Sequence, residues 1–129
     1  MDKTISYLKK LFHILTLLLI ILSLYPGSIL GFLLYEDFKY HPQLTKDFAY
    51  ISSNHFYVYF ILSALGFFSY LKDNKFKLII IYLFFLSFIL EILHFVIPKR
   101  GFEISDLVGN ILGVLIAYIV VIIYKYWRK

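Results

Sequence analysis

Four apolar runs separated by polar breaks dominate the chain. They cover about residues 8–25, 51–71, 78–97 and 104–124. A helix needs roughly 20 residues to cross the hydrocarbon core of a bilayer, and each run has about this length. The pattern therefore predicts an all-α fold, a bundle of four transmembrane helices that forms a single integral membrane domain over residues 1–129.

The first run has a basic flank and an apolar centre, a pattern that also occurs in secretory signals. No small-x-small cleavage site follows it, because residues 23–27 read Ser-Leu-Tyr-Pro-Gly. We interpret the run as an uncleaved anchor that begins near Tyr7. Pro26 and Gly27 are expected to break this helix or to mark its end.

The segment between the first two runs is mixed. Residues 28–35 are apolar but too few to cross a bilayer, and residues 36–47 carry several charges. We predict an outer loop over residues 28–53, with a short interfacial or re-entrant piece followed by an aqueous part. A connection of this length is uncommon unless it contacts something. Two interpretations of this loop fit the sequence: a lid over the polar residues described below, or a simple linker.

Composition supports the membrane assignment. Hydrophobic residues make up 61% of the chain and charged residues only 16%, whereas about a quarter of the residues of soluble proteins are charged. The mean hydropathy is +0.81. The chain contains no cysteine, which excludes disulfides, zinc thiolates and thiol catalysis.

The net charge of +5 could suggest a nucleic-acid partner, but the basic residues lie at the ends of the apolar runs, where they anchor helices. No nucleic acid is therefore expected. Cytoplasmic loops usually carry the excess of Lys and Arg. With four crossings, one side holds Lys3, Lys9, Lys10, Lys72, Lys75, Lys77, Lys125, Arg128 and Lys129, and the other holds Lys39, Lys46, Lys99 and Arg100. We predict that both termini are cytoplasmic and that the outer loops are residues 28–53 and 98–103.

Polar residues gather around the turn between the third and fourth runs. Glu91 and His94 are three apart and Asp106 and Asn110 are four apart, so each pair shares a helix face. At 1.5 Å per residue, Glu91 and Asn110 both lie roughly 9 Å below the outer ends of their helices. The predicted polar pocket below the outer surface consists of His55, Glu91, His94, Arg100, Asp106 and Asn110.

Each of these residues also has a structural interpretation. A carboxylate at this depth is costly in lipid, so Glu91 should face the bundle interior and find Arg100, a histidine or Asn110. With Arg100 it could form an ion pair that locks the hairpin. Asp106 could cap the last helix, where an anion suits the helix dipole. His55 and His94 could be interfacial histidines without a ligand.

Small residues on the last run favour close helix packing. Gly109 and Gly113 form a small-xxx-small pair of the kind that lets transmembrane helices approach each other. Asn110 lies between them and could form a hydrogen bond between helices. We assign the two glycines to helix packing.

This pattern resembles the signature of VanZ-like membrane proteins. These have a glutamate in one helix, an arginine in the following turn, and an Asp-x-x-x-Asn-x-x-Gly run that opens the next helix. An upstream His-Phe-x-x-Tyr element in this chain also resembles one found in the family. In this chain the matching residues are Glu91, Arg100, Asp106, Asn110, Gly113, His55, Phe56 and Tyr59.

The resemblance covers about residues 50–120, so the long outer loop falls outside it. The chain departs from the family at His94, where members often have other residues. The resemblance implies a small multi-pass protein of the bacterial envelope, in the inner (plasma) membrane. It also implies a link to glycopeptide resistance of the teicoplanin kind, the property of the founding member.

Three functions fit these residues. We favour a binding or accessory protein that recognises an anionic lipid or a lipid-linked envelope precursor, with Arg100, and also His55 or Lys99, contacting phosphate. A membrane hydrolase or transferase would use Glu91 or His55 as a general base, but no His-Glu-x-x-His or serine-nucleophile motif supports it. A proton-coupled lipid carrier would need a dimer, because no internal repeat is evident. No metal or cofactor is expected. The sequence is compatible with a homo-oligomer.

Overall fold

The computed structural model describes residues 2–129. In this part of the chain it contains five α-helices and no β-strand, only an isolated bridge between Phe48 and Ile51. The all-α prediction is confirmed. The helices are α1 (Lys3–Leu24), α2 (Ile29–Tyr35), α3 (Ser53–Tyr70), α4 (Phe76–Leu93) and α5 (Ile104–Trp127).

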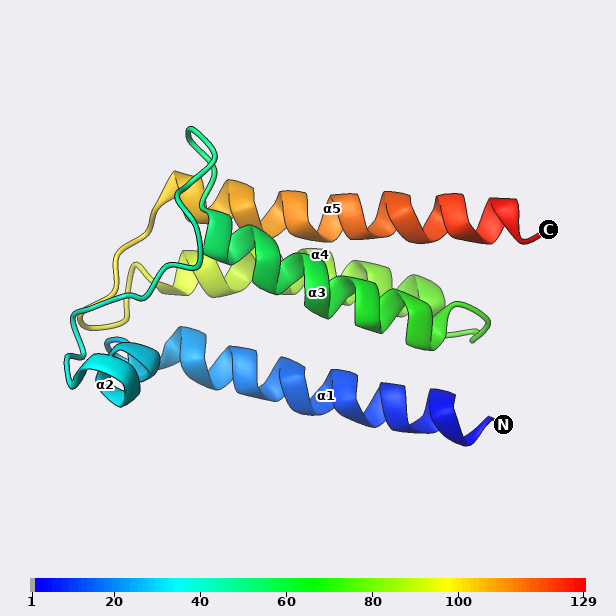
Figure 1. Ribbon diagram of the computed structural model, residues 1–129, viewed down its shortest axis with the longest axis horizontal. Helices are drawn as coiled ribbons and strands as arrows, with labels where there is room; N and C mark the ends of the chain where they lie inside the picture. The colour runs from blue at the N-terminus through cyan, green and yellow to red at the C-terminus, as the bar shows by residue number, and fades with distance from the viewer. Residues whose placement is uncertain (1) are drawn as a thin grey trace.

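The four long helices run side by side as a bundle, and α2 lies at one end of it (Figure 1). The two chain termini and the short turn between α3 and α4 lie at the opposite end. The connection from α2 to α3 and the connection from α4 to α5 are therefore at the same end as α2. We call this end the loop end and the other the terminal end.

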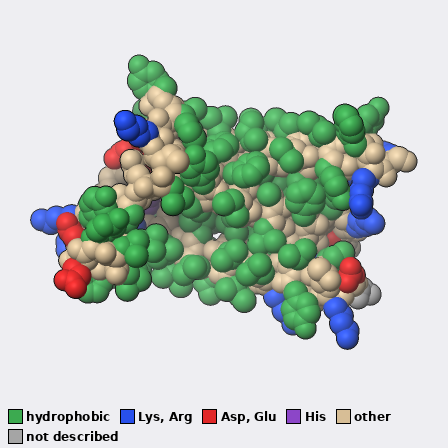
Figure 2. All heavy atoms as spheres, viewed as in Figure 1, with side chains coloured by type: hydrophobic (Ala, Val, Ile, Leu, Met, Phe, Trp, Pro, Cys, Tyr) green, Lys and Arg blue, Asp and Glu red, His purple; other side chains and the backbone are tan. Residues whose placement is uncertain are grey.

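Three helices, α1, α4 and α5, are long and apolar enough to cross a membrane. Helix α3, which has 18 residues, is not among them. On the face shown in Figure 2, hydrophobic side chains cover the middle, and charged side chains gather at the two ends. This distribution is that of a protein that spans a bilayer, where the apolar band faces lipid and the charges face water.

The break after α1 separates the apolar segment 28–35 from the first helix. Tyr25 ends α1 in an extended conformation, and Gly27 has a φ of +105°, a left-handed conformation that glycine adopts without strain. Ser28 then starts α2, and its side chain accepts a hydrogen bond from the Gly31 amide at 2.9 Å. Segment 28–35 is thus a separate short helix, not a continuation of α1.

Helix α4 ends earlier than the predicted third span, at Leu93 rather than at residue 97. The amides of His94, Phe95 and Val96 donate to carbonyls three residues back, which tightens the chain into successive turns. Pro98 follows, and it disfavours a helical conformation for the residue before it. The helix therefore stops where this tight segment begins.

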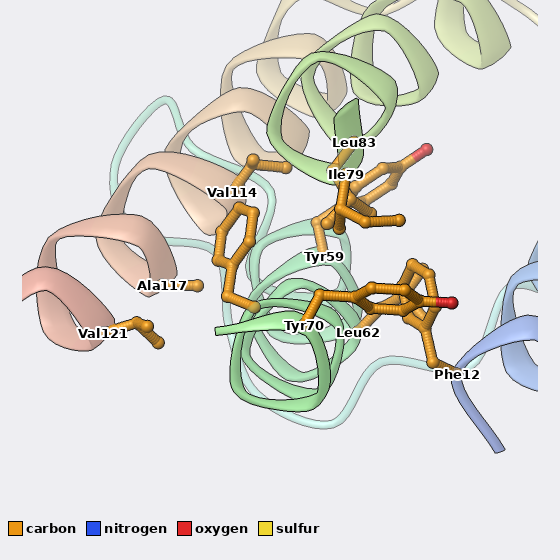
Figure 3. Packing of buried hydrophobic residues seen from close by; sticks show 10 residues of the cluster. Phe12, Tyr59, Leu62, Tyr70, Ile79, Leu83, Val114, Ala117 and Val121 are labelled. Carbon is orange, nitrogen blue, oxygen red and sulfur yellow. The ribbon is translucent and has the colours of Figure 1, made fainter. Parts of the chain in front are cut away.

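Helix α3 occupies the centre of the bundle. It contacts the other three long helices, and its contact with α5 is the most extensive in the molecule. The buried side chains that meet around it form one hydrophobic cluster, shown in part in Figure 3. The members of this cluster are Phe12, Tyr59, Leu62, Phe67, Tyr70, Ile79, Leu83, Val114, Ala117 and Val121.

Glycines allow α5 to lie directly against the backbone of α3. A Cβ atom added at Gly113 would come within 2.7 Å of the Phe56 carbonyl oxygen and 2.8 Å of the Phe60 amide nitrogen. A Cβ at Gly109 would lie 2.7 Å from the Ser52 carbonyl oxygen. These contacts are with backbone atoms, so a larger residue would have to push the two helices apart.

We expect Gly113→Ala to lower the free energy of unfolding by about 1–3 kcal/mol, the usual cost of overpacking. This cost should exceed the gain of about 1 kcal/mol that alanine has over glycine in helix propensity. Thermal unfolding in detergent, followed by circular dichroism, measures it. Gly101→Ala is the control, because a Cβ there meets nothing within 4 Å. Unchanged unfolding of Gly113→Ala would show that the two helices are not in contact at this residue.

Candidate functional site

A cavity of about 600 Å³ opens at the loop end of the bundle. One wall is apolar and consists of side chains from α1 and α3. The polar part lies toward the loops and includes His55, Lys99, Arg100 and Asp106. The apolar wall consists of Leu15, Leu18, Leu19, Leu22, Val58, Ile61 and Leu62.

His55 is positioned by an amide that has only one satisfactory orientation. The Nδ2 group of Asn110 donates to the Ser87 carbonyl oxygen at 3.2 Å, so Asn110 Oδ1 faces His55 Nδ1 at 2.8 Å. An amide oxygen can only accept, and therefore His55 Nδ1 carries the proton. This hydrogen-bonded chain links α3, α5 and α4 and leaves Nε2 as the other reactive nitrogen of His55.

Two carboxylates lie near the His55 side chain. His55 Nε2 is 3.4 Å from Asp106 Oδ2, and both side chains are partly buried. Glu91 approaches from α4, so that one ligand atom from each of His55, Glu91 and Asp106 lies within 4.8 Å of the other two. Three helices thus bring an imidazole and two carboxylates together.

Glu91 is fully buried and forms a second group with His94. Its Oε1 accepts a hydrogen bond from the Glu103 amide at 3.1 Å and lies 3.2 Å from His94 Nδ1. The other ring nitrogen of His94, Nε2, lies 3.0 Å from the Ser23 carbonyl oxygen. When both nitrogens are protonated, His94 therefore donates to Glu91 and to α1 at once. Glu91 Oε2 is buried and has no hydrogen-bond partner.

Arg100 does not pair with Glu91, so the ion-pair interpretation of these two residues is wrong. Its guanidinium instead donates from Nε to the Tyr25 carbonyl at 3.1 Å and from Nη2 to the Leu22 carbonyl at 2.7 Å. These carbonyls lie at the C-terminal end of α1, where helix oxygens lack partners and a cation suits the helix dipole. Arg100 thus fastens α1 to the turn that follows α4.

The capping interpretation of Asp106 is not what the structure shows either. Helix α5 begins after Glu103, and no side chain caps it. Asp106 lies in the first turn, where its charge suits the helix dipole, but its side chain points to His55. Asp106 therefore belongs to the polar group and not to the helix terminus.

The connection between α2 and α3 contributes to the cavity, as a covering loop would. His41 and Asp47 from this connection line it. Asn54 holds the connection in place, since it donates to the Pro42 carbonyl and accepts from the Leu44 amide. Partial burial lowers the pKa of His41, and the nearby Arg100 guanidinium lowers it further.

The predicted site residues divide into three groups. The side chains of His55, Asp106 and Asn110 are in direct contact, and Glu91 with its partner His94 adjoins them. Arg100 lines the same cavity but is bonded to α1. Gly109 and Gly113 lie against α3 beside the group.

Other parts of the site could not be found from the sequence. The carbonyls of Ser23, Leu22 and Ser87 are backbone groups that any residue type would provide. The apolar wall from α1 looks the same in sequence as a lipid-facing surface. His41 was passed over because the only signal for it was its place in a charged loop.

A family model described as VanZ/LLP1 matches residues 5–125 of the chain. Comparison with curated proteins and with solved structures gives no match. The matched segment includes all the residues of the polar group and the cavity.

We expect Asn110→Ala to lower the free energy of unfolding by about 1–3 kcal/mol, because it leaves His55 Nδ1 without its acceptor and removes the hydrogen bond from α5 to the Ser87 carbonyl of α4. Chemical unfolding in detergent measures this. Ser87→Ala is the matched control, since it keeps the backbone carbonyl that Asn110 needs and removes only a hydroxyl bonded within its own helix. Equal losses in both variants would contradict the assignment of Asn110 as the orienting group.

Proposed function

The chain belongs to the VanZ/LLP1 family, and on that basis we propose that it is a multi-pass protein of the bacterial inner membrane that recognises an anionic lipid. The ligand class is a phospholipid or a lipid-linked envelope precursor, which would suit an accessory role of the glycopeptide-resistance kind. The observation that carries this proposal is the amphipathic cavity at the loop end.

The cavity matches the two halves of such a ligand. Its leucine-rich wall between α1 and α3 offers an apolar surface for a hydrocarbon chain. Lys99 and Arg100 lie at its polar part, near the level expected for a headgroup. A lipid would therefore place its chain along the bundle and its phosphate at the turn after α4.

Arg100 has donors left for a phosphate. A guanidinium carries five N–H donors in a planar fork that suits phosphate oxygens. The structure uses Nε and Nη2 for α1 carbonyls, so the Nη1 donors stay available. Lys99 is exposed and lines the cavity as a second, more mobile cation.

We also propose that α3 crosses the membrane, which gives four crossings with both termini in the cytoplasm. Helix α3 has 18 residues, about 27 Å at 1.5 Å per residue, close to the thickness of the hydrocarbon core. Its modest apolarity is compatible with crossing, because α1, α4 and α5 pack around it and take much of the lipid contact. The terminal end carries most of the Lys and Arg residues, as a cytoplasmic end should.

Cysteine labelling tests this orientation, since the native chain contains no cysteine. In intact cells, a membrane-impermeant maleimide should label Lys39→Cys but neither Lys75→Cys nor Lys129→Cys. All three should react after lysis. Labelling of Lys129→Cys from outside, with Lys3→Cys protected, would instead indicate three crossings and contradict the four-span arrangement.

Native mass spectrometry of the purified protein tests lipid recognition. We expect the wild type to retain a phosphate-bearing lipid and Lys99→Ala to retain at least severalfold less, because a cation that contacts phosphate is lost. Arg100→Ala should lose more, but it also removes the hydrogen bonds to α1. The Lys99 side chain forms no hydrogen bond with the other described residues. A loss of lipid in Lys99→Ala would therefore report lost binding and not lost folding.

The controls for this experiment lie at the terminal end. Lys72→Ala and Arg128→Ala remove the same charges far from the cavity, although both residues line a separate groove there. They should retain the lipid at the wild-type level. If all four variants retain the same amount, the contact between the phosphate and the turn after α4 does not exist.

A further inference from the structure

We propose that His55, Glu91 and Asp106 form a binding site for a divalent transition-metal cation, with Zn²⁺ as the probe. The sequence contains no familiar metal motif, and no metal was expected from it. The ligands come one each from α3, α4 and α5, so they are distant in sequence and meet only in the folded bundle.

The spacing of the ligand atoms suits a metal ion. Two ligands at about 2.1 Å from a tetrahedral Zn²⁺ lie roughly 3.4 Å apart. His55 Nε2 and Asp106 Oδ2 already have this separation, 3.4 Å. One ligand atom from each of the three residues lies within 4.8 Å of the other two, so Glu91 has to approach the other two ligands to complete the set.

The orientation of His55 supports coordination through Nε2. Metal-bound histidines usually donate their other ring N–H to a carbonyl or carboxylate, which fixes the tautomer. Here Asn110 Oδ1 is that acceptor at 2.8 Å, and Asn110 is itself fixed by the Ser87 carbonyl at 3.2 Å. Nε2 of the neutral ring therefore presents its lone pair beside Asp106 Oδ2, with Glu91 nearby.

Glu91 provides an independent indication of a missing ligand. The residue is 1% exposed, and Oε2 has no hydrogen-bond partner. Oε1 is already occupied by the Glu103 amide and His94. A buried carboxylate oxygen without a partner is costly, and a cation held with His55 and Asp106 would satisfy it.

A divalent cation also contacts both carboxylates at once, which a single proton cannot do. In neutral His55 the N–H donates to Asn110, so Nε2 offers no donor to Asp106 or Glu91. The cations around them are engaged elsewhere, His94 with Glu91 Oε1 and Arg100 with α1 carbonyls. A proton on His55 Nε2 would serve Asp106 but would not provide Glu91 Oε2 with a contact.

The ligand set selects the class of metal. Imidazole favours zinc, copper, iron and nickel, whereas Mg²⁺ and Ca²⁺ prefer sets made only of oxygen. One imidazole and two carboxylates supply three of the four positions that zinc takes. Because His55 and Asp106 also line the cavity, the fourth position would face it and stay open to water or another oxygen ligand.

Isothermal titration of the chelator-treated protein in detergent with Zn²⁺ tests the site. We expect one Zn²⁺ per chain and at least a tenfold weaker affinity in Asp106→Asn, His55→Gln and Glu91→Gln. Asp106→Asn is the decisive variant, because this side chain is partly exposed and its loss is least damaging to folding. His13→Gln and Asp73→Asn remove the same groups at the terminal end and should bind like the wild type.

Two outcomes would overturn the site. One is a wild-type affinity for Zn²⁺ no tighter than that of Asp106→Asn. The other is an equal loss in His13→Gln, which would indicate unspecific binding by histidines. The proposal does not depend on lipid recognition: Arg100→Ala should keep its Zn²⁺ even if it loses lipid. Failure of lipid retention with an intact zinc titration would therefore reject the proposed function alone.

Discussion

The close contact between α3 and α5 is the constraint on which the rest of the structure depends. Gly109 and Gly113 allow the backbones to touch, and the Ser52 amide donates to the Ser105 carbonyl where the two helices begin. His55 on α3 then lies within hydrogen-bond distance of Asn110 and next to Asp106 on α5. The glycines contribute no chemistry themselves, but no larger residue would let these polar side chains meet.

The surrounding bilayer explains why the polar groups are so completely paired. A buried polar atom cannot turn to water, so each needs a partner within the protein. Asn110 uses both ends of its amide, and His94 lies between Glu91 and a carbonyl of α1. Among the described residues, Glu91 Oε2 and Ser63 Oγ are the buried side-chain atoms without a hydrogen-bond partner, and a bound cation would provide one for Glu91.

The sequence predicted those parts of the molecule that depend on side-chain periodicity. The helices and the shared faces of Glu91 with His94, and of Asp106 with Asn110, follow from spacing alone. The role of Arg100 does not, because its partners are backbone carbonyls that no residue type marks. The end of α4 was also missed, since residues 94–97 are as apolar as a helix but tighten before the proline.

The mixed charge of the cavity connects the two proposals. Lys99 and Arg100 would attract a phosphate, while Asp106 and the nearby Glu91 would repel it at short range. A divalent cation between the two carboxylates removes this repulsion and presents an open position to the cavity, where a phosphate oxygen could bind. Without the cation, the lipid phosphate would have to stay on the Lys99 side. If both proposals hold, the location of the phosphate within the cavity would therefore depend on the metal bound at the site on α3, α4 and α5.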